Sequence, residues 1–83
     1  MEKSIHSAQY AVFLRLLREK RQGAGLTQAQ LARRIRETQT FVSKCERGER
    51  RVDLIELRTF CKACGMSLKQ FVAALDREIG RAK

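Results

Sequence analysis

Residues 26–48 read LTQAQLARRIRETQTFVSKCERG, and this stretch decides the fold. Thr27 and Gln30 have the spacing of a capping box, so a short helix is expected to open at Thr27. Thr38 offers a second N-cap, and Gly48 is a typical residue just beyond the end of a helix. The pattern therefore predicts two helices joined by a tight connection, the second of them over residues 39–46.

The residues before this stretch, 7–22, predict an amphipathic helix. Its apolar stripe has the spacing i, i+3, i+4, i+7 and consists of Tyr10, Phe13, Leu14 and Leu17. Ser7 can cap this helix, and the turn at residues 23–25 ends it. Val12 and Leu16 lie on the opposite side, where they are either isolated surface residues or contacts to the C-terminal helix or to a second subunit.

Two further helices are expected after the stretch. Asp53 and Glu56 have capping-box spacing at the start of the first, and Gly65 ends it. Its buried face is expected to be Leu54, Leu57, Phe60, Cys61 and Cys64. Ser67 and Gln70 have the same spacing before the last helix, whose apolar stripe is Leu68, Phe71, Val72, Leu75 and Ile79.

The chain is thus predicted to be all-α, with five helices in one domain over residues 1–83. The absence of proline and the low content of β-branched residues favour helices over strands. The core is expected over about residues 7–79, with the first few residues and those from about residue 80 loosely held.

The 83 residues carry a formal net charge of +9, and the pI is about 10.4. A small domain this basic usually binds a polyanion, most often a nucleic acid. A merely basic, soluble surface is the alternative. An anionic membrane is disfavoured, because the basic residues are not gathered on one long amphipathic helix. Without a bilayer-spanning apolar run or a signal-peptide pattern, a cytoplasmic protein with no membrane association is expected.

The helix expected over residues 39–46 divides into an inner and an outer face on a helical wheel. The inner face contains Phe41, Val42 and Cys45, with Glu46 at its margin. The outer face carries Thr40, Ser43, Lys44 and Arg47, with Gln39 at its edge. Glutamine can bond adenine, lysine can donate to guanine, and a threonine methyl can contact thymine. An ordinary solvated face is equally compatible with these residues, so they do not decide the function alone.

A wider set of residues resembles the phage-repressor and Cro-type (XRE-like) helix-turn-helix family. The matching segments are residues 25–28 (GLTQ), 30–32 (QLA), 38–44 (TQTFVSK), 46–48 (ERG), 54–57 (LIEL) and 62–68 (KACGMSL). The resemblance covers about residues 10–75, and its combined spacing is specific although each piece alone is weak. It implies a compact five-helix, lambda-repressor-like DNA-binding domain with the helix-turn-helix at its second and third helices.

The resemblance also implies roles for individual residues at a DNA surface. The base-reading positions of the family correspond to Gln39, Thr40 and Lys44, and Ser43 stands between them facing the groove. The phosphate-contacting positions correspond to Gln28, Arg47, Arg50 and Arg51. We expect two residues of the connection to contact phosphates as well, Arg36 and Thr38.

Arg21 and Glu46 resemble the family's buried arginine–glutamate pair between its first and third helices, with Arg18 as the alternative partner. Removing one member of a semi-buried pair would cost roughly 3–5 kcal/mol. A surface ion pair would contribute only about 0–1 kcal/mol. The buried pair is the favoured interpretation.

The connection between the two central helices departs from the family, which often has glycine and then a hydrophobic residue there. This chain has Arg36 and Glu37 instead. A left-handed conformation at Arg36 would cost roughly 1–2 kcal/mol, which a phosphate contact could offset. Glu37 is expected to face away from the DNA backbone. Phe41 is expected to lie partly exposed beside a sugar-phosphate strand.

Cys61 and Cys64 form a C-x-x-C motif that could indicate zinc or redox chemistry. A structural zinc site usually needs four ligands, and the chain offers only three cysteines and the distant His6. A redox motif is expected near a βαβ unit, which the pattern does not contain. We interpret both cysteines, and Cys45, as small core residues. No role for His6, no metal, no cofactor and no enzymatic activity are predicted.

Together these features predict a sequence-specific regulator of transcription that binds double-stranded DNA, with residues 39–46 in the major groove. Repression by occupancy is expected, with activation as the other outcome; a phage or plasmid repressor and a restriction-modification controller fit equally well. A homodimer on a palindromic operator is expected, joined through the last helix with Ile55 or through Val12 and Leu16. The alternative class is a protein-interaction adaptor, such as an antitoxin with a protein partner, and RNA binding is less favoured.

Overall fold

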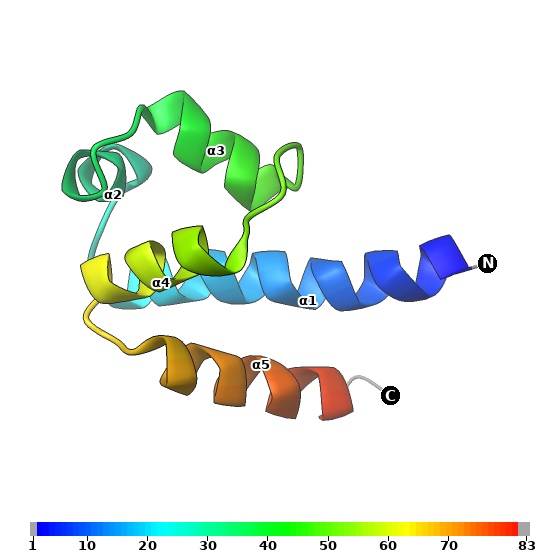
Figure 1. Cartoon of the computed structure of the whole chain (residues 1–83). Coiled ribbons are helices and arrows are strands. Elements are labelled where there is room, and N and C mark those ends of the chain that lie inside the picture. The colour runs from blue at the N-terminus through cyan, green and yellow to red at the C-terminus, as the bar shows by residue number, and fades with distance from the viewer. Residues whose placement is uncertain (1, 82–83) are drawn as a thin grey trace.

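A computed structural model describes residues 2–81, with side chains from residue 8 onward. This part of the chain forms five helices and no strand, which confirms the all-α prediction (Figure 1). The helices are α1 Glu2–Gly23, α2 Gln28–Arg34, α3 Gln39–Arg47, α4 Leu54–Ala63 and α5 Leu68–Arg81. No helix in this part of the chain is both long enough and apolar enough to cross a membrane.

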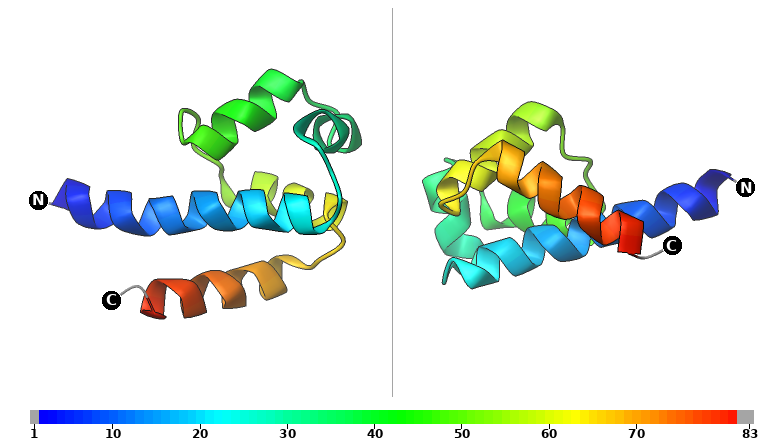
Figure 2. Two further views of the ribbon diagram at one scale, coloured as in Figure 1. Left: turned by 180° about the vertical axis from the view of Figure 1, so that it is seen from behind. Right: turned by 90° about the horizontal axis from the view of Figure 1, so that it is seen from below.

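The long helix α1 is the element on which α3 and α5 both pack (Figure 1). From behind, α5 runs alongside α1, while α2 and α3 lie on the other side of it (Figure 2). Helix α4 packs against α2 and α5 and so closes the core. All five helices contribute buried apolar side chains, including Leu17, Leu31, Val42, Phe60 and Phe71.

The helix starts follow the capping pattern of the sequence. At α2 and α4, Thr27 with Gln30 and Asp53 with Glu56 form complete capping boxes. The Thr38 hydroxyl accepts from the Phe41 backbone N–H at 3.1 Å. Before α5, Ser67 and Gln70 exchange reciprocal bonds of 2.9 and 3.1 Å. The four starts that were predicted at Thr27, Thr38, Asp53 and Ser67 are therefore confirmed.

Helices α1 to α4 all end with a residue in the left-handed conformation. The φ angles are 76° at Gly25, 61° at Arg36, 80° at Gly48 and 78° at Gly65. In each case the backbone N–H of the following residue donates to the carbonyl oxygen five residues before it. The Glu37 N–H, for example, donates to the Ala32 oxygen at 2.8 Å. Glycine adopts this conformation without a penalty, whereas Arg36 has a Cβ atom and pays roughly 1–2 kcal/mol.

Replacing Arg36 by glycine is expected to raise the free energy of unfolding by about 1 kcal/mol. Relief of the left-handed strain outweighs the extra freedom that glycine gives the unfolded chain. Urea unfolding measures the difference. Arg36→Ala is the matched control, because alanine removes the same charge but keeps the Cβ atom and its strain. An Arg36→Gly variant no more stable than Arg36→Ala would show that relief of strain does not outweigh the extra freedom that glycine gives the unfolded chain.

Two expected helix boundaries were wrong. Ser7 does not cap α1, which begins at Glu2 and continues through it, since no glycine or proline precedes Ser7 to stop the helix. Helix α5 continues through Gly80 to Arg81, although residues from about 80 were expected to be loose. His6, to which no role was assigned, lies in α1 with its side chain outside the described part.

Burial also differs from the expected stripes at three positions. Leu16 is only 4% exposed, because α1 is covered from two sides by α3 and α5 and so buries two faces. This excludes the isolated surface position for Leu16, one of the alternatives that the sequence left open. Leu54 is 61% exposed, since the buried stripe of α4 begins one turn later at Leu57. Val72 is 43% exposed, and Ala74 takes its place in the core three residues after the buried Phe71.

Candidate nucleic-acid interface

Helix α3 separates a buried face from a polar one. Val42 and Cys45 are completely buried, and Glu46 is 3% exposed. On the opposite side Ser43 is half-buried, and the exposed side chains are Gln39, Thr40, Lys44 and Arg47. Figure 1 shows α3 at the outer edge of the molecule, on the side away from α5. The amide, hydroxyl and amino groups of the outer face are thus accessible.

The connection before α3 is exposed as well. Arg36, Glu37 and Thr38 all lie at the surface, and the Thr38 hydroxyl caps α3. Phe41, in the first turn of α3, is half-buried and packs edge-on against Phe60, with ring centroids 6.3 Å apart. The start of α3 is therefore held from one side by its cap and from the other by an aromatic contact.

A buried ion pair holds the inner side of α3 against α1. Arg21 Nε donates to Glu46 Oε2 at 2.6 Å, and the second terminal nitrogen of Arg21 donates to Oε1 at 3.0 Å. The remaining terminal nitrogen donates to the Leu26 carbonyl at 2.9 Å. Both charged residues are buried, whereas Arg18 is exposed.

Gln28 extends this pair to the start of α2. Its amide nitrogen donates to Glu46 Oε1 at 3.0 Å, and the residue is half-buried. An amide nitrogen has two hydrogens, so one N–H of Gln28 remains for an outside acceptor. The three side chains of Arg21, Gln28 and Glu46 thus connect α1, α2 and α3 at one point.

The arginines at the end of α3 and in the loop after it are partly engaged within the protein. Arg47 pairs with Glu49 at 2.9 Å and donates to the Ser43 hydroxyl. Arg51 places its guanidinium carbon 5.3 Å from the Tyr10 ring centroid. The hydrogen bond from Arg47 lowers the pKa of Glu49, because it favours the charged form of this carboxylate.

Arg50 forms the most complete set of contacts in this loop. Its two terminal nitrogens donate to the two Glu56 carboxylate oxygens at 2.8 Å each. Its guanidinium carbon lies 4.7 Å from the Phe41 ring centroid. Sequence reasoning missed Glu56 as a partner, because residues six positions apart across a loop have no periodic relation. The spacing of Asp53 and Glu56 predicted the role of Glu56 in the capping box, but it did not predict the bonds from Arg50.

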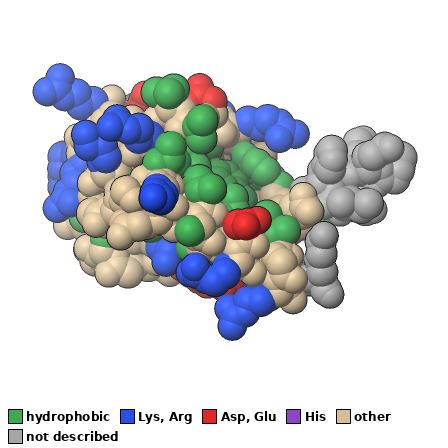
Figure 3. Space-filling view, turned by 60° about the horizontal axis from the view of Figure 1, so that its bottom comes forward, with side chains coloured by type: hydrophobic (Ala, Val, Ile, Leu, Met, Phe, Trp, Pro, Cys, Tyr) green, Lys and Arg blue, Asp and Glu red, His purple; other side chains and the backbone are tan. Residues whose placement is uncertain are grey.

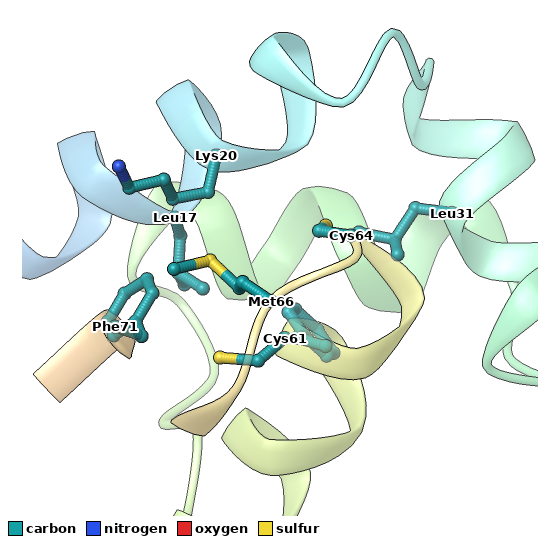
Figure 4. Close-up of a pocket in the computed structure, with 8 residues that line it drawn as sticks. Leu17, Lys20, Leu31, Cys61, Cys64, Met66 and Phe71 are labelled. Carbon is teal, nitrogen blue, oxygen red and sulfur yellow. The ribbon is translucent and has the colours of Figure 1, made fainter. Parts of the chain in front are cut away.

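The C-x-x-C cysteines lie in the interior. Cys61 is buried and Cys64 half-buried, and both line a small, mostly apolar pocket with Leu17, Met66 and Phe71 (Figure 4). Burial raises the pKa of the Cys61 thiol to about 11 and also raises the pKa of Cys64. Among the described side chains, no group of three or more potential ligands could hold a metal ion.

The α5 side of the molecule has a different character. Figure 3 shows hydrophobic side chains gathered on this side, with basic side chains around them. The large exposed apolar residues of the described part are Leu54, Ile55 and Val72, which belong to α4 and α5. A polar face on α3 and an apolar surface on α4 and α5 are thus separate features.

Comparison with known proteins places these features in context. Residues 9–76 match the family model described as a helix-turn-helix domain. The chain is 43% identical to an XRE-family like protein from Pseudomonas syringae pv. tomato str. DC3000, with a TM-score of 0.85 over 93% of this chain and 94% of that one. It is 26% identical to the clp gene regulator ClgR from Corynebacterium glutamicum, with a TM-score of 0.76 over 89% of this chain and 78% of that one. No match was found among curated protein sequences.

Proposed function

The chain belongs to the XRE-type helix-turn-helix family of DNA-binding transcription regulators, and we propose that it is a repressor that reads the major groove with α3. The observation that carries this proposal is the division of α3 into a polar outer face and a buried inner face. An α-helix fits the width of the major groove, and a polar outer face can form hydrogen bonds with the base edges there. By occupying a promoter site, the protein would exclude other DNA-binding proteins from it.

The bases are read from the exposed side of α3. Lys44 donates to guanine O6 or N7, and Gln39 bonds the N6 and N7 atoms of adenine. Thr40 and Ser43 lie on the same side and supply a methyl group and hydroxyls. These four residues are the proposed source of sequence preference, since contacts to base edges carry sequence information and contacts to phosphates do not.

Phosphates are bound by residues around this face, which set the position of α3 on the duplex. The proposed set is Gln28, Arg36, Thr38, Arg47 and Arg51. Gln28 keeps one amide N–H for this contact. The contact of Arg36 with a phosphate offsets the strain of its left-handed conformation. Arg47 also pairs with a carboxylate, but Glu49 is exposed and no aromatic ring lies under Arg47 among the described residues. Arg50 is left out of this set, because its partner Glu56 is half-buried and its guanidinium group also covers Phe41.

We further propose a homodimer on a palindromic operator. The exposed apolar residues of α4 and α5, Leu54, Ile55 and Val72, support a dimer contact there. The alternative dimer contact through α1 cannot include Leu16, because this residue is buried within the chain. A dimer would place the two α3 helices about 34 Å apart, one turn of the DNA helix.

Selection from a random duplex library tests the proposed function. The wild-type protein is expected to enrich two inverted half-sites about one helical turn apart. The same selection with Lys44→Ala is expected to relax the preference at one or two base pairs of each half-site, at a cost of about 1–3 kcal/mol for each base pair that Lys44 no longer reads. Sequencing of the enriched duplexes measures both outcomes.

Lys62→Ala is the matched control for this selection. Lys62 is also an exposed lysine, but it lies in the last turn of α4 rather than on α3. The Lys62→Ala variant should therefore enrich the same sequence as the wild type. Enrichment of no sequence would contradict the repressor, a single half-site would contradict the dimer, and equal effects of the two lysine variants would contradict reading by α3.

A further inference from the structure

Arg50 is bound within the protein on several sides. Both Glu56 oxygens accept from it at 2.8 Å, and the Arg51 carbonyl accepts a further bond at 2.8 Å. Its guanidinium group also lies over the Phe41 ring, 4.7 Å from the centroid. Paired bonds to a carboxylate and stacking on an aromatic ring are the two main ways in which a guanidinium group binds. Arg50 uses both within its own chain.

The partners of Arg50 are themselves held in place. Glu56 Oε1 also accepts from the Asp53 backbone N–H at 3.0 Å, which completes the capping box of α4. Phe41 packs edge-on against Phe60 of α4. The Arg50 cluster, consisting of Phe41, Arg50 and Glu56, therefore joins the first turn of α3 to the start of α4.

We propose that Arg50 is a positioning residue, which orients the DNA-reading face of α3 through Phe41 and does not bind phosphate. This inference rests on the proposed function. Turning Arg50 to a phosphate would break two charge-assisted bonds and leave the Glu56 carboxylate unpaired near the DNA backbone. The hydrogen bonds from Arg50 and from the Asp53 backbone lower the pKa of Glu56, because they favour its charged form.

The role of Arg50 differs from that of its neighbour Arg51. Among the described side chains Arg51 makes no ion pair, and it only lies over the Tyr10 ring at 5.3 Å. A phosphate can therefore approach Arg51 without displacing any carboxylate of the described side chains. The two adjacent arginines are assigned opposite roles, with Arg51 binding the backbone and Arg50 holding the reading helix.

The test compares Arg50→Lys, Arg50→Ala, Glu56→Gln and Arg51→Ala with the wild type, on the selected duplex and on a scrambled duplex, over a series of salt concentrations. Lysine keeps the charge of Arg50 but cannot bond both carboxylate oxygens and cover the ring at once. Glutamine keeps the capping box of α4 but loses the charge that pairs with Arg50. Thermal unfolding checks that each variant is folded at the assay temperature.

Arg50→Lys and Glu56→Gln are each expected to lower the ratio of selected to scrambled affinity by about 3- to 30-fold. Neither should change the slope of log affinity against log salt, because neither variant removes a bond to a phosphate. Arg51→Ala should reduce that slope by about one unit for each phosphate that Arg51 binds in the wild type, while leaving the ratio almost unchanged. A purely structural role would lower the unfolding temperature but not this ratio in the folded protein.

Besides the unchanged ratio of a purely structural role, two further results would overturn the assignment of Arg50. One is an unchanged ratio in Arg50→Lys together with a reduced salt slope in Arg50→Ala, as expected of a residue that binds phosphate. The other is tighter binding of both duplexes by Glu56→Gln with the ratio unchanged, as expected if the variant frees Arg50 for DNA. Equal wild-type affinity for both duplexes would instead overturn the proposed function itself, and the two failures are therefore distinguishable.

Discussion

Replacing Glu46 by alanine is expected to lower the free energy of unfolding by about 3–5 kcal/mol. The Glu46 carboxylate is buried and accepts from Arg21 at 2.6 and 3.0 Å and from Gln28 at 3.0 Å. Without it, Arg21 becomes a buried charge without a carboxylate partner. Since a domain of this size has a total stability of about 4–12 kcal/mol, the substitution removes a large part of it. Urea unfolding followed by circular dichroism measures the change.

Two further variants identify the cause of this destabilisation. Glu49→Ala removes a carboxylate from an exposed pair with Arg47, so the free energy of unfolding should change little. The double variant Arg21→Met with Glu46→Leu removes both buried charges and should be less destabilised than Glu46→Ala, because no unpaired charge remains. If Glu49→Ala were as destabilised as Glu46→Ala, burial would not be the reason.

DNA affinity is expected to fall by about 10³–10⁵-fold between about 50 and 200 mM salt, for a dimer that binds about 6–10 phosphates. Each bound phosphate releases condensed counterions, and added salt opposes this release. The net charge of +9 and the exposed arginines around α3 support phosphate binding on this scale. Titration of the selected duplex at several salt concentrations gives the slope of log affinity against log salt.

The slope also separates the residues at the interface from those elsewhere. Arg36→Ala should reduce it by about one unit for each phosphate that Arg36 binds in the wild type. Arg58→Ala removes an exposed arginine of α4 that lies outside the proposed phosphate-binding set, and it should leave the slope unchanged. An affinity that hardly changed with salt would mean that phosphate contacts do not dominate the binding.

Helix boundaries could largely be predicted from the sequence, because the signals are local. A capping box such as Thr27 with Gln30 places both donors and both acceptors within four residues. The same holds for Asp53 with Glu56, and a glycine marks the ends of α1, α3 and α4, whereas Arg36 at the end of α2 gives no such signal. The prediction was wrong at Ser7, where a residue able to cap a helix lies within one, since capping ability does not by itself stop a helix.

Burial could be predicted only in part. A period of 3.6 residues identifies which side of a helix is apolar, but it does not show how much of that side a neighbour covers. Leu54 lies on the expected stripe of α4 and is exposed, while Leu16 lies off the stripe of α1 and is buried. The difference follows from the packing of α3 and α5 on two sides of α1.

By itself, the sequence determined the five helices, the N-caps of α2 to α5 and the polar outer face of α3, because each depends on residues a few positions apart. Only the tertiary structure decided which polar side chains form hydrogen bonds within the protein and with which partners. Gln28 bonds Glu46 from another helix, and Arg50 bonds Glu56 across a loop. Such contacts depend on distances between atoms of different elements, which no periodicity in the sequence encodes.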